Sequence, residues 1–206
     1  MISAIVLAAG ESRRMGRQKV LLPFGDSTVL EEIVTAIEVS KIGSGVVVTG
    51  HQPERVAQLL AGRSLSAVHN PAYSEGMLSS IRAGLRGLPN QAQGVMLFLG
   101  DQPQVDVPLI DHLCETFQSG SGQLCVPTFG GRRGHPLLFD RSYEDEILND
   151  FDEVGLRGLL QRYEARVCPV PWDNEGVLVD LDTPEDYARA LEQSRISGEG
   201  LVGTGE

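Results

Sequence analysis

The run Val95-Met96-Leu97-Phe98-Leu99 constrains the fold most, because it is unbroken by any polar residue. A strand with one face in water alternates apolar and polar side chains, whereas a strand covered on both faces gains from a continuous apolar run. Sheets covered on both faces are usually parallel and carry helices on each side. The run therefore predicts an α/β fold in which this strand is buried between helices.

Short apolar runs alternate with longer amphipathic stretches along the chain. Apolar runs predict strands at 2–7, 45–49, 66–69, 95–99, 124–127, 136–139, 167–170 and 177–179. Helical spacing predicts helices at 29–40, 53–60, 77–88 and 183–192, the last capped by Thr183 with Pro184 in its first turn. Strand-loop-helix units in the first part favour a mostly parallel, mixed sheet. A length of 206 residues fits one domain, and we expect it at 1–192, with a flexible tail at 193–206.

The overall charge limits the classes of partner. The formal net charge is −11, which opposes binding to nucleic acid or to an anionic membrane. Cys114, Cys125 and Cys168 form no Cys-x-x-Cys pair, so they are expected as reduced thiols. Positive residues follow the apolar start at 1–9, the reverse of a secretory signal. We therefore expect a cytoplasmic protein.

The loop after the first predicted strand differs from the acidic remainder of the chain. Residues 7–19 read Leu-Ala-Ala-Gly-Glu-Ser-Arg-Arg-Met-Gly-Arg-Gln-Lys. Gly10 and Gly16 allow backbone N–H groups to face an anion, and Arg14 and Lys19 are suited to phosphate. The spacing matches neither the Walker loop nor the dinucleotide fingerprint. The loop predicts a phosphate site, and an ordinary basic surface loop is the alternative.

Carboxylates follow two other predicted strands. Asp101 comes directly after the buried run, in Gly-Asp-Gln-Pro, where it would suit Mg²⁺ or simply cap a turn. In the predicted strand at 177–179 and its continuation, alternation places Asp180 and Asp182 on one face. Either of these two would add a second metal ligand.

Two further segments carry polar groups suited to binding. Gly76 and the first amides of the helix at 77–88 would face a base or phosphate, with a hydroxyl from Ser79 or Ser80. A plain capping segment with Ser74 at the N-cap is the alternative.

The second segment is Gly-Gly-Arg-Arg-Gly-His-Pro at 130–136. Arg132 and Arg133 would clamp a phosphate, and His135 would orient it or hydrogen-bond a heterocycle. A structural histidine is the alternative.

The pattern Leu-Ala-Ala-Gly-x-Ser-x-Arg-Met-Gly-x-x-Lys resembles the signature of the MobA-like nucleotidyltransferases, which are related to the molybdenum cofactor enzymes. The resemblance implies a single-domain Rossmann-like three-layer α/β sandwich. It implies a catalytic role for Arg14, Lys19 and Asp101, and a Mg²⁺ site, with Mn²⁺ as a substitute, on Asp101 and Asp182. The residues that it implies for nucleotide binding are Leu7, Ala8, Ala9, Gly10, Lys19, Gly76, Ser79 and Ser80.

Two further likenesses refine the expected reaction. Asn-Pro…Gly-Met-x-x-Ser, with Leu-Ala-Ala-Gly instead of Leu-Ala-Gly-Gly, is similar to the cytidylyltransferase branch and favours CTP. Gly-x-x-Gly-His-Pro resembles the acceptor segment and assigns Arg132, Arg133 and His135 to the acceptor. The resemblance implies CMP transfer to a phosphorylated acceptor, foremost molybdopterin, with release of pyrophosphate and a molybdoenzyme as partner. GTP, another phosphorylated metabolite, or a non-catalytic nucleotide-binding or chaperone module are the alternatives.

Overall fold

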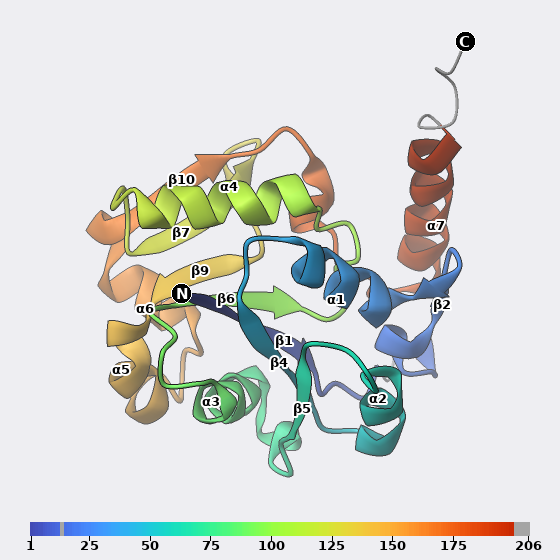
Figure 1. Cartoon of the computed structure of the whole chain (residues 1–206), viewed down its shortest axis with the longest axis horizontal. Coiled ribbons are helices and arrows are strands. Elements are labelled where there is room, and N and C mark those ends of the chain that lie inside the picture. The colour runs from blue at the N-terminus through green and yellow to red at the C-terminus, as the bar shows by residue number, and fades with distance from the viewer. Residues whose placement is uncertain (13–14, 200–206) are drawn as a thin grey trace.

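The computed structural model describes residues 1–12 and 15–199, and describes side chains as far as residue 195 (Figure 1). Its strands are β1 (Ile2–Ala8), β2 (Pro23–Phe24), β3 (Ser27–Thr28), β4 (Ser44–Thr49), β5 (Ser66–His69), β6 (Gly94–Leu99), β7 (Leu124–Phe129), β8 (Arg132–Arg133), β9 (Leu137–Asp140) and β10 (Val167–Pro171). Its α-helices are α1 (Val29–Val39), α2 (Pro53–Leu59), α3 (Met77–Gly87), α4 (Val107–Gln118), α5 (Glu144–Asn149), α6 (Arg157–Arg162) and α7 (Pro184–Glu199). Its short 3-10 helices are η2 (Lys19–Leu21), η3 (Tyr73–Glu75), η4 (Arg141–Tyr143), η5 (Glu164–Arg166) and η6 (Glu175–Leu178).

The main sheet is mixed, as expected. Its strand order is β10-β7-β9-β6-β1-β4-β5, and β8 pairs with β7. β1 runs parallel to both β4 and β6, whereas β9 runs antiparallel to β6 and β7. The carboxyl ends of β1, β4 and β6 therefore lie along one edge of the sheet, which is where open α/β sheets bind ligands.

Two helical layers cover the sheet (Figure 1). Met96 and Phe98 of β6 belong to a core that includes apolar residues of α1, α2 and α4. Val95 and Leu97 belong to a second core, with residues of α3, α5 and α6. Since both faces of β6 are buried, each position gains from an apolar side chain, and the three-layer prediction is confirmed.

The strand predicted at 177–179 is wrong, because these residues lie in η6 and the turn after it. The Asn174 side chain accepts from the Gly176 N–H at 2.8 Å, which starts the 3-10 turn. Single hydrogen bonds then tie the segment to the sheet edge. His135 N donates to Val177 O at 2.9 Å, and Leu181 N donates to Asp101 O at 3.1 Å.

The predicted cap of the last helix is confirmed, and the helix continues beyond residue 192 to Glu199. Thr183 Oγ1 accepts from the Asp186 N–H at 3.2 Å, and Asp186 Oδ2 accepts from the Thr183 N–H at 3.0 Å. Tyr187 and Leu191 pack beside buried Phe24, so α7 docks on the β2–β3 hairpin (Figure 1). Of the predicted tail, residues 200–206 lie outside the described residues.

The cysteines are free, as expected. Burial raises the pKa of Cys114 to about 11 and that of Cys125 to about 12, so neither thiol ionises readily. Within the described ranges, no helix is both long enough and apolar enough to cross a membrane.

Candidate active site

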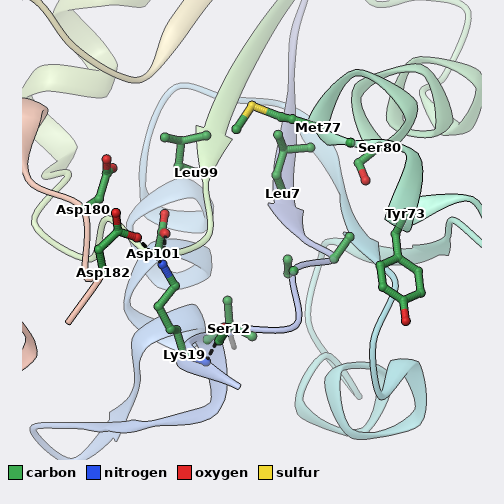
Figure 2. A pocket seen from close by; sticks show the side chains of 15 residues that line it. Leu7, Ser12, Lys19, Tyr73, Met77, Ser80, Leu99, Asp101, Asp180 and Asp182 are labelled. Atoms are coloured by element: carbon green, nitrogen blue, oxygen red, sulfur yellow. Dashed lines mark hydrogen bonds and ion pairs between the residues drawn. The ribbon is translucent and has the colours of Figure 1, made fainter. Parts of the chain in front are cut away.

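A cavity of about 480 Å³ lies where the carboxyl ends of β1 and β6 meet the start of α3 (Figure 2). It brings together segments that are far apart in the sequence. The predicted site residues that line it are Leu7, Ala8, Ala9, Gly10, Lys19, Gly76, Ser80, Asp101 and Asp182. Asp180, which the sequence left open as the second metal ligand, lines it as well.

Lys19, the last residue of the loop at 7–19, faces the cavity. Ser12 Oγ accepts a hydrogen bond from Lys19 N at 3.0 Å, which closes the loop. Buried Gln18 donates through Nε2 to His51 O at 2.9 Å, which ties the loop to the turn after β4. These two contacts fix the backbone from which the Lys19 side chain extends. Arg14, predicted as catalytic, lies outside the described residues.

The Lys19 ammonium joins the two predicted metal ligands (Figure 2). Lys19 Nζ lies 2.6 Å from Asp101 Oδ2 and 2.9 Å from Asp182 Oδ1. Burial by itself would lower the pKa of Lys19, but the hydrogen bonds and charges of Asp101 and Asp182 outweigh it and raise the pKa above its ordinary value. Lys19 is therefore a cation that holds two anions at one point.

Asp180 lies beside this cluster but has a different partner. Gln102 Nε2 donates to Asp180 Oδ1 at 2.8 Å. Although much of the residue is exposed, partial burial of its carboxyl group raises the pKa of Asp180, and the nearby charges of Asp101 and Asp182 raise it further. Three carboxylates thus share one end of the cavity, with one ammonium among them.

These carboxylates fit a divalent cation. Asp101 and Asp182 both reach one position, that of the Lys19 ammonium, and Mg²⁺ bound to nucleotides commonly takes one or two carboxylates, phosphate oxygens and water. Within residues 1–12 and 15–199, no group of three or more His, Cys, Asp or Glu residues forms a complete metal site. A metal held here therefore needs additional oxygens from the substrate or from water.

The opposite end of the cavity is formed by the start of α3. Gly76, the N-cap of α3, has a φ of 114°, which favours glycine, and the alternative N-cap Ser74 lies within η3 instead. Ser80 lines the cavity, whereas Ser79 is turned inward, with its Oγ 2.9 Å from Ala72 O.

Tyr73 and Met77 also line this end, and neither is among the predicted site residues (Figure 2). Both lie in the segment whose glycine and hydroxyls suit nucleotide binding. Hydrogen-bonding groups alone do not indicate side chains that contribute shape. Met77 is 58% exposed at the first position of α3, an unusual place for a large apolar residue, and this is the signal that would have found it.

A second cavity of about 390 Å³ adjoins the first, since Gly76 and Met77 line both. His135 lines the second cavity, and its Nδ1 is buried without a hydrogen-bond partner among the described residues. Burial lowers the pKa of His135 despite the nearby Asp101 charge, so the ring is neutral at pH 7. His135 therefore adds a neutral polar ring to the lining of this cavity.

Arg132 and Arg133 lie apart from both cavities. They form the short strand β8, they are exposed, and neither lines either cavity. Arg133 is paired with Glu164 at 3.4 Å. Contact of these two arginines with an acceptor phosphate therefore stays a prediction.

Comparison with known proteins agrees with this geometry. Residues 4–167 match the model of the MobA-like NTP transferase domain. The molybdenum cofactor cytidylyltransferase of Escherichia coli (strain K12) is 27% identical over 198 residues, which are 93% of this chain and 96% of that protein.

Solved structures show the same likeness. The crystal structure of Rv0371c from Mycobacterium tuberculosis H37Rv superimposes with a TM-score of 0.80 at 29% identity, covering 93% of this chain and 98% of that one. A manganese complex of Rv0371c gives a TM-score of 0.76 at 27% identity, covering 93% and 97%. The sequence of the loop at 7–19, the paired aspartates and these matches together lead to one assignment: the chain belongs to the MobA-like NTP transferase family and is a nucleotidyltransferase.

Proposed function

We propose that this enzyme transfers CMP from CTP to a phosphorylated acceptor, foremost molybdopterin, and releases pyrophosphate. The observation that carries the proposal is the convergence of Lys19, Asp101 and Asp182 at one end of a cavity that the Leu7–Gly10 backbone also lines. The likeness over nearly the whole chain to a molybdenum cofactor cytidylyltransferase supports the choice of nucleotide and acceptor. The product would then pass to a molybdoenzyme.

The chemistry proposed is a single displacement at phosphorus. An oxygen of the acceptor phosphate attacks the α-phosphorus of CTP, the bond from that phosphorus to the bridging oxygen breaks, and pyrophosphate leaves with the bonding pair. The acceptor phosphate is already ionised near pH 7, so the chain need not supply a general base. Catalysis then depends on holding the reactants in line and on neutralising charge.

The residues divide this work between them. The small side chains of Ala8, Ala9 and Gly10 leave room for the nucleotide against the backbone. Lys19 neutralises phosphate charge that grows in the transition state. Asp101 and Asp182 would hold Mg²⁺, or Mn²⁺ in its place, and the bound metal supplies further neutralisation of the phosphates. The manganese complex of the similar protein Rv0371c supports the use of a divalent metal.

We place the ring of the acceptor in the second cavity. Its walls include the apolar side chains of Leu78, Ile81 and Leu137, which suit the faces of a flat heterocycle. His135 gives the same cavity a polar group, and the shared Gly76–Met77 wall brings it next to the nucleotide. Such an arrangement places the two substrates side by side, as a direct displacement requires.

Incubation with Mg²⁺, molybdopterin and each of the four nucleoside triphosphates tests the proposal, with pyrophosphate release and product mass as readouts. We expect a cytosine dinucleotide and the fastest release with CTP. Faster release with GTP would overturn the nucleotide, and release only with another phosphorylated metabolite would overturn the acceptor. Binding of nucleotide without any transfer would indicate a non-catalytic module.

His135→Ala tests whether the acceptor binds in the second cavity and CTP in the first. The expected result is a rise of about tenfold in the KM for the acceptor, because a buried hydrogen-bond partner is lost, with little change in the KM for CTP. The converse result, a rise for CTP alone, would contradict the placement of the acceptor.

A further inference from the structure

Asn70, directly after β5, has a fixed side-chain orientation. Its Oδ1 accepts from the Ala72 N–H at 3.0 Å, and a backbone N–H can only donate, so the oxygen and nitrogen of the amide are unambiguous. Nδ2 therefore points the other way and donates to Ser79 Oγ at 2.9 Å and to Ser80 Oγ at 3.0 Å. Asn70 is only 4% exposed, so water does not compete for these contacts.

The two serines that accept these hydrogen bonds differ in whether their own hydroxyl protons are donated within the protein. Ser79 Oγ lies 2.9 Å from Ala72 O and 2.8 Å from Gly76 O, so its proton is donated within the protein. Ser80 Oγ accepts from Asn70, and among the described residues no acceptor is hydrogen-bonded to its proton. Ser80 lines the first cavity (Figure 2). Since Asn70 Nδ2 can only donate, it cannot take the Ser80 proton, which stays available to a ligand in the cavity.

We propose that Asn70 is a positioning residue that sets base preference, because it leaves the Ser80 proton free to be donated to an acceptor atom of the base. The inference rests on the proposed function in two respects, that this cavity takes a nucleoside triphosphate and that the preferred base is cytosine. Cytosine presents two neighbouring acceptors, O2 and N3, on its pairing edge, whereas guanine presents two donors and one acceptor there. An available donor at Ser80 therefore favours cytosine.

Asn70→Asp replaces the donor Nδ2 with an oxygen that accepts, with almost no change of shape. One carboxylate oxygen still accepts from the Ala72 N–H, but the other oxygen can only accept, so Ser80 must turn its proton toward residue 70. The hydroxyl then presents only lone pairs to the base. We expect the Kd for CTP to rise about 10- to 100-fold, the cost of an unpaired buried polar group, and the Kd for GTP to change less than about threefold.

The measurement is calorimetric titration of the full chain with Mg²⁺ and each of the four nucleoside triphosphates, which needs no acceptor substrate. A double-mutant cycle with Ser80→Ala separates positioning from general disruption. If Asn70 acts through Ser80, Asn70→Asp causes little further loss of CTP affinity in the Ser80→Ala background. An equal rise in Kd for all four nucleotides, or full additivity of the two substitutions, would overturn the proposal.

Asn70→Ala is the second variant, to be used if the buried carboxylate of Asn70→Asp prevents folding. Thermal melting would reveal such a failure. It removes the Nδ2 donor without adding charge, so Ser80 becomes free to rotate, and we expect CTP selectivity to fall by about threefold to tenfold. Unchanged selectivity would overturn the proposal. Failure of the proposed function looks different, since the wild-type protein itself would then release no pyrophosphate or would bind GTP more tightly than CTP.

Discussion

Lys19 shows how much of the site a sequence can reveal at the scale of single residues. The loop pattern singled out Lys19, and the position after a buried strand singled out Asp101, so both could be predicted. The choice between Asp180 and Asp182 could not be made from the residues alone, because strand alternation places both on one face and favours neither. That alternation also assumed a strand in a segment that is not a strand. Instead, the Asp182 N–H donates to Asp180 O at 3.0 Å, a tight turn that leaves both residues lining the cavity.

Replacement of Lys19 by Met tests whether Asp101 and Asp182, which bind the Lys19 ammonium, also bind a metal. Transfer should fall about 100- to 1,000-fold, since a charge-neutralising group is lost. Binding of Mn²⁺ without nucleotide should become tighter, because the ammonium no longer competes for Asp101 and Asp182. Paramagnetic resonance of free Mn²⁺ measures this affinity.

Lys41→Met is the matched control, because Lys41 is half-exposed and pairs with the surface carboxylate of Glu115. It should change neither transfer nor Mn²⁺ affinity. If Lys19→Met abolished transfer but left Mn²⁺ affinity unchanged, the metal would not occupy the carboxylates that Lys19 holds.

Asp180→Asn should stabilise the fold at pH 7. The pKa of Asp180 is raised in the folded state, so ionisation there costs stability once the pH exceeds the pKa of the unfolded chain, about 4. Below that pH the carboxyl is neutral in both states and the advantage of Asn disappears. Thermal melting at pH 7 and pH 4 should therefore show a higher Tm for the variant only at the higher pH. A constant difference at both pH values would contradict this account.

At the scale of elements, the strands with continuous apolar runs could be predicted, whereas η6 and the β2–β3 hairpin could not. Val177-Leu178-Val179 has the composition of a strand, but an Asn174 side-chain bond and contacts to loop ends decide its conformation. The β2–β3 hairpin has only two residues in each strand, too few for a periodic pattern. Neither a capping bond two residues long nor a hairpin this short leaves a periodic apolar pattern in the sequence.

Gly100, directly after β6, offers a test of whether close packing of the strand ends fixes the position of Asp101. A Cβ added at Gly100 would lie 2.5 Å from Leu7 O and 3.1 Å from Val20 Cγ1, and the backbone of β1 has no room to move. Gly100→Ala should destabilise the protein by about 1–3 kcal/mol and displace the adjacent Asp101, which lowers kcat about tenfold or more. Chemical unfolding and steady-state kinetics measure the two effects.

Gly43→Ala is the control for this change. Its added Cβ would meet the flexible Met1 side chain, 3.0 Å away at Cγ, and Gly43 is remote from the cavity residues. We expect a small stability change and normal kcat. Normal kcat in Gly100→Ala as well would show that Asp101 tolerates displacement of the strand end.

At the scale of the whole molecule, α7 docks beside the segment that carries Asp182. Leu181, fully buried, and Tyr187 tie the end of the described chain to the β2–β3 hairpin, and Asp182 lies between them in the sequence. The sequence predicted the start of this helix from its cap, but not its docking, since α7 is polar on most of its surface. The docking partners lie more than a hundred residues away in the chain.

A chain that ends at residue 183 should keep its sheet but lose activity. Without α7, Phe24 and Leu181 become exposed and Asp182 loses its anchor, so the Tm should fall and transfer should decrease at least about 100-fold. A chain that ends at residue 199 keeps the contacts of Tyr187, Ala190 and Leu191 and should match the full chain. Circular dichroism, melting and pyrophosphate release compare the three. Wild-type transfer by the shorter chain would remove Asp182 from the proposed site.

The amino-terminal rim of the sheet, at the starts of β1 and β6, is a suitable place to attach a label. There the Met1 amino group donates to Gln93 Oε1 at 3.0 Å, on the side of β1 and β6 opposite to the edge where the cavities open. None of the described residues that line the two cavities belongs to this rim. A fluorophore, a solid support or a fused carrier attached there would leave substrate entry unobstructed, so single-molecule or surface-based assays can be built on that side.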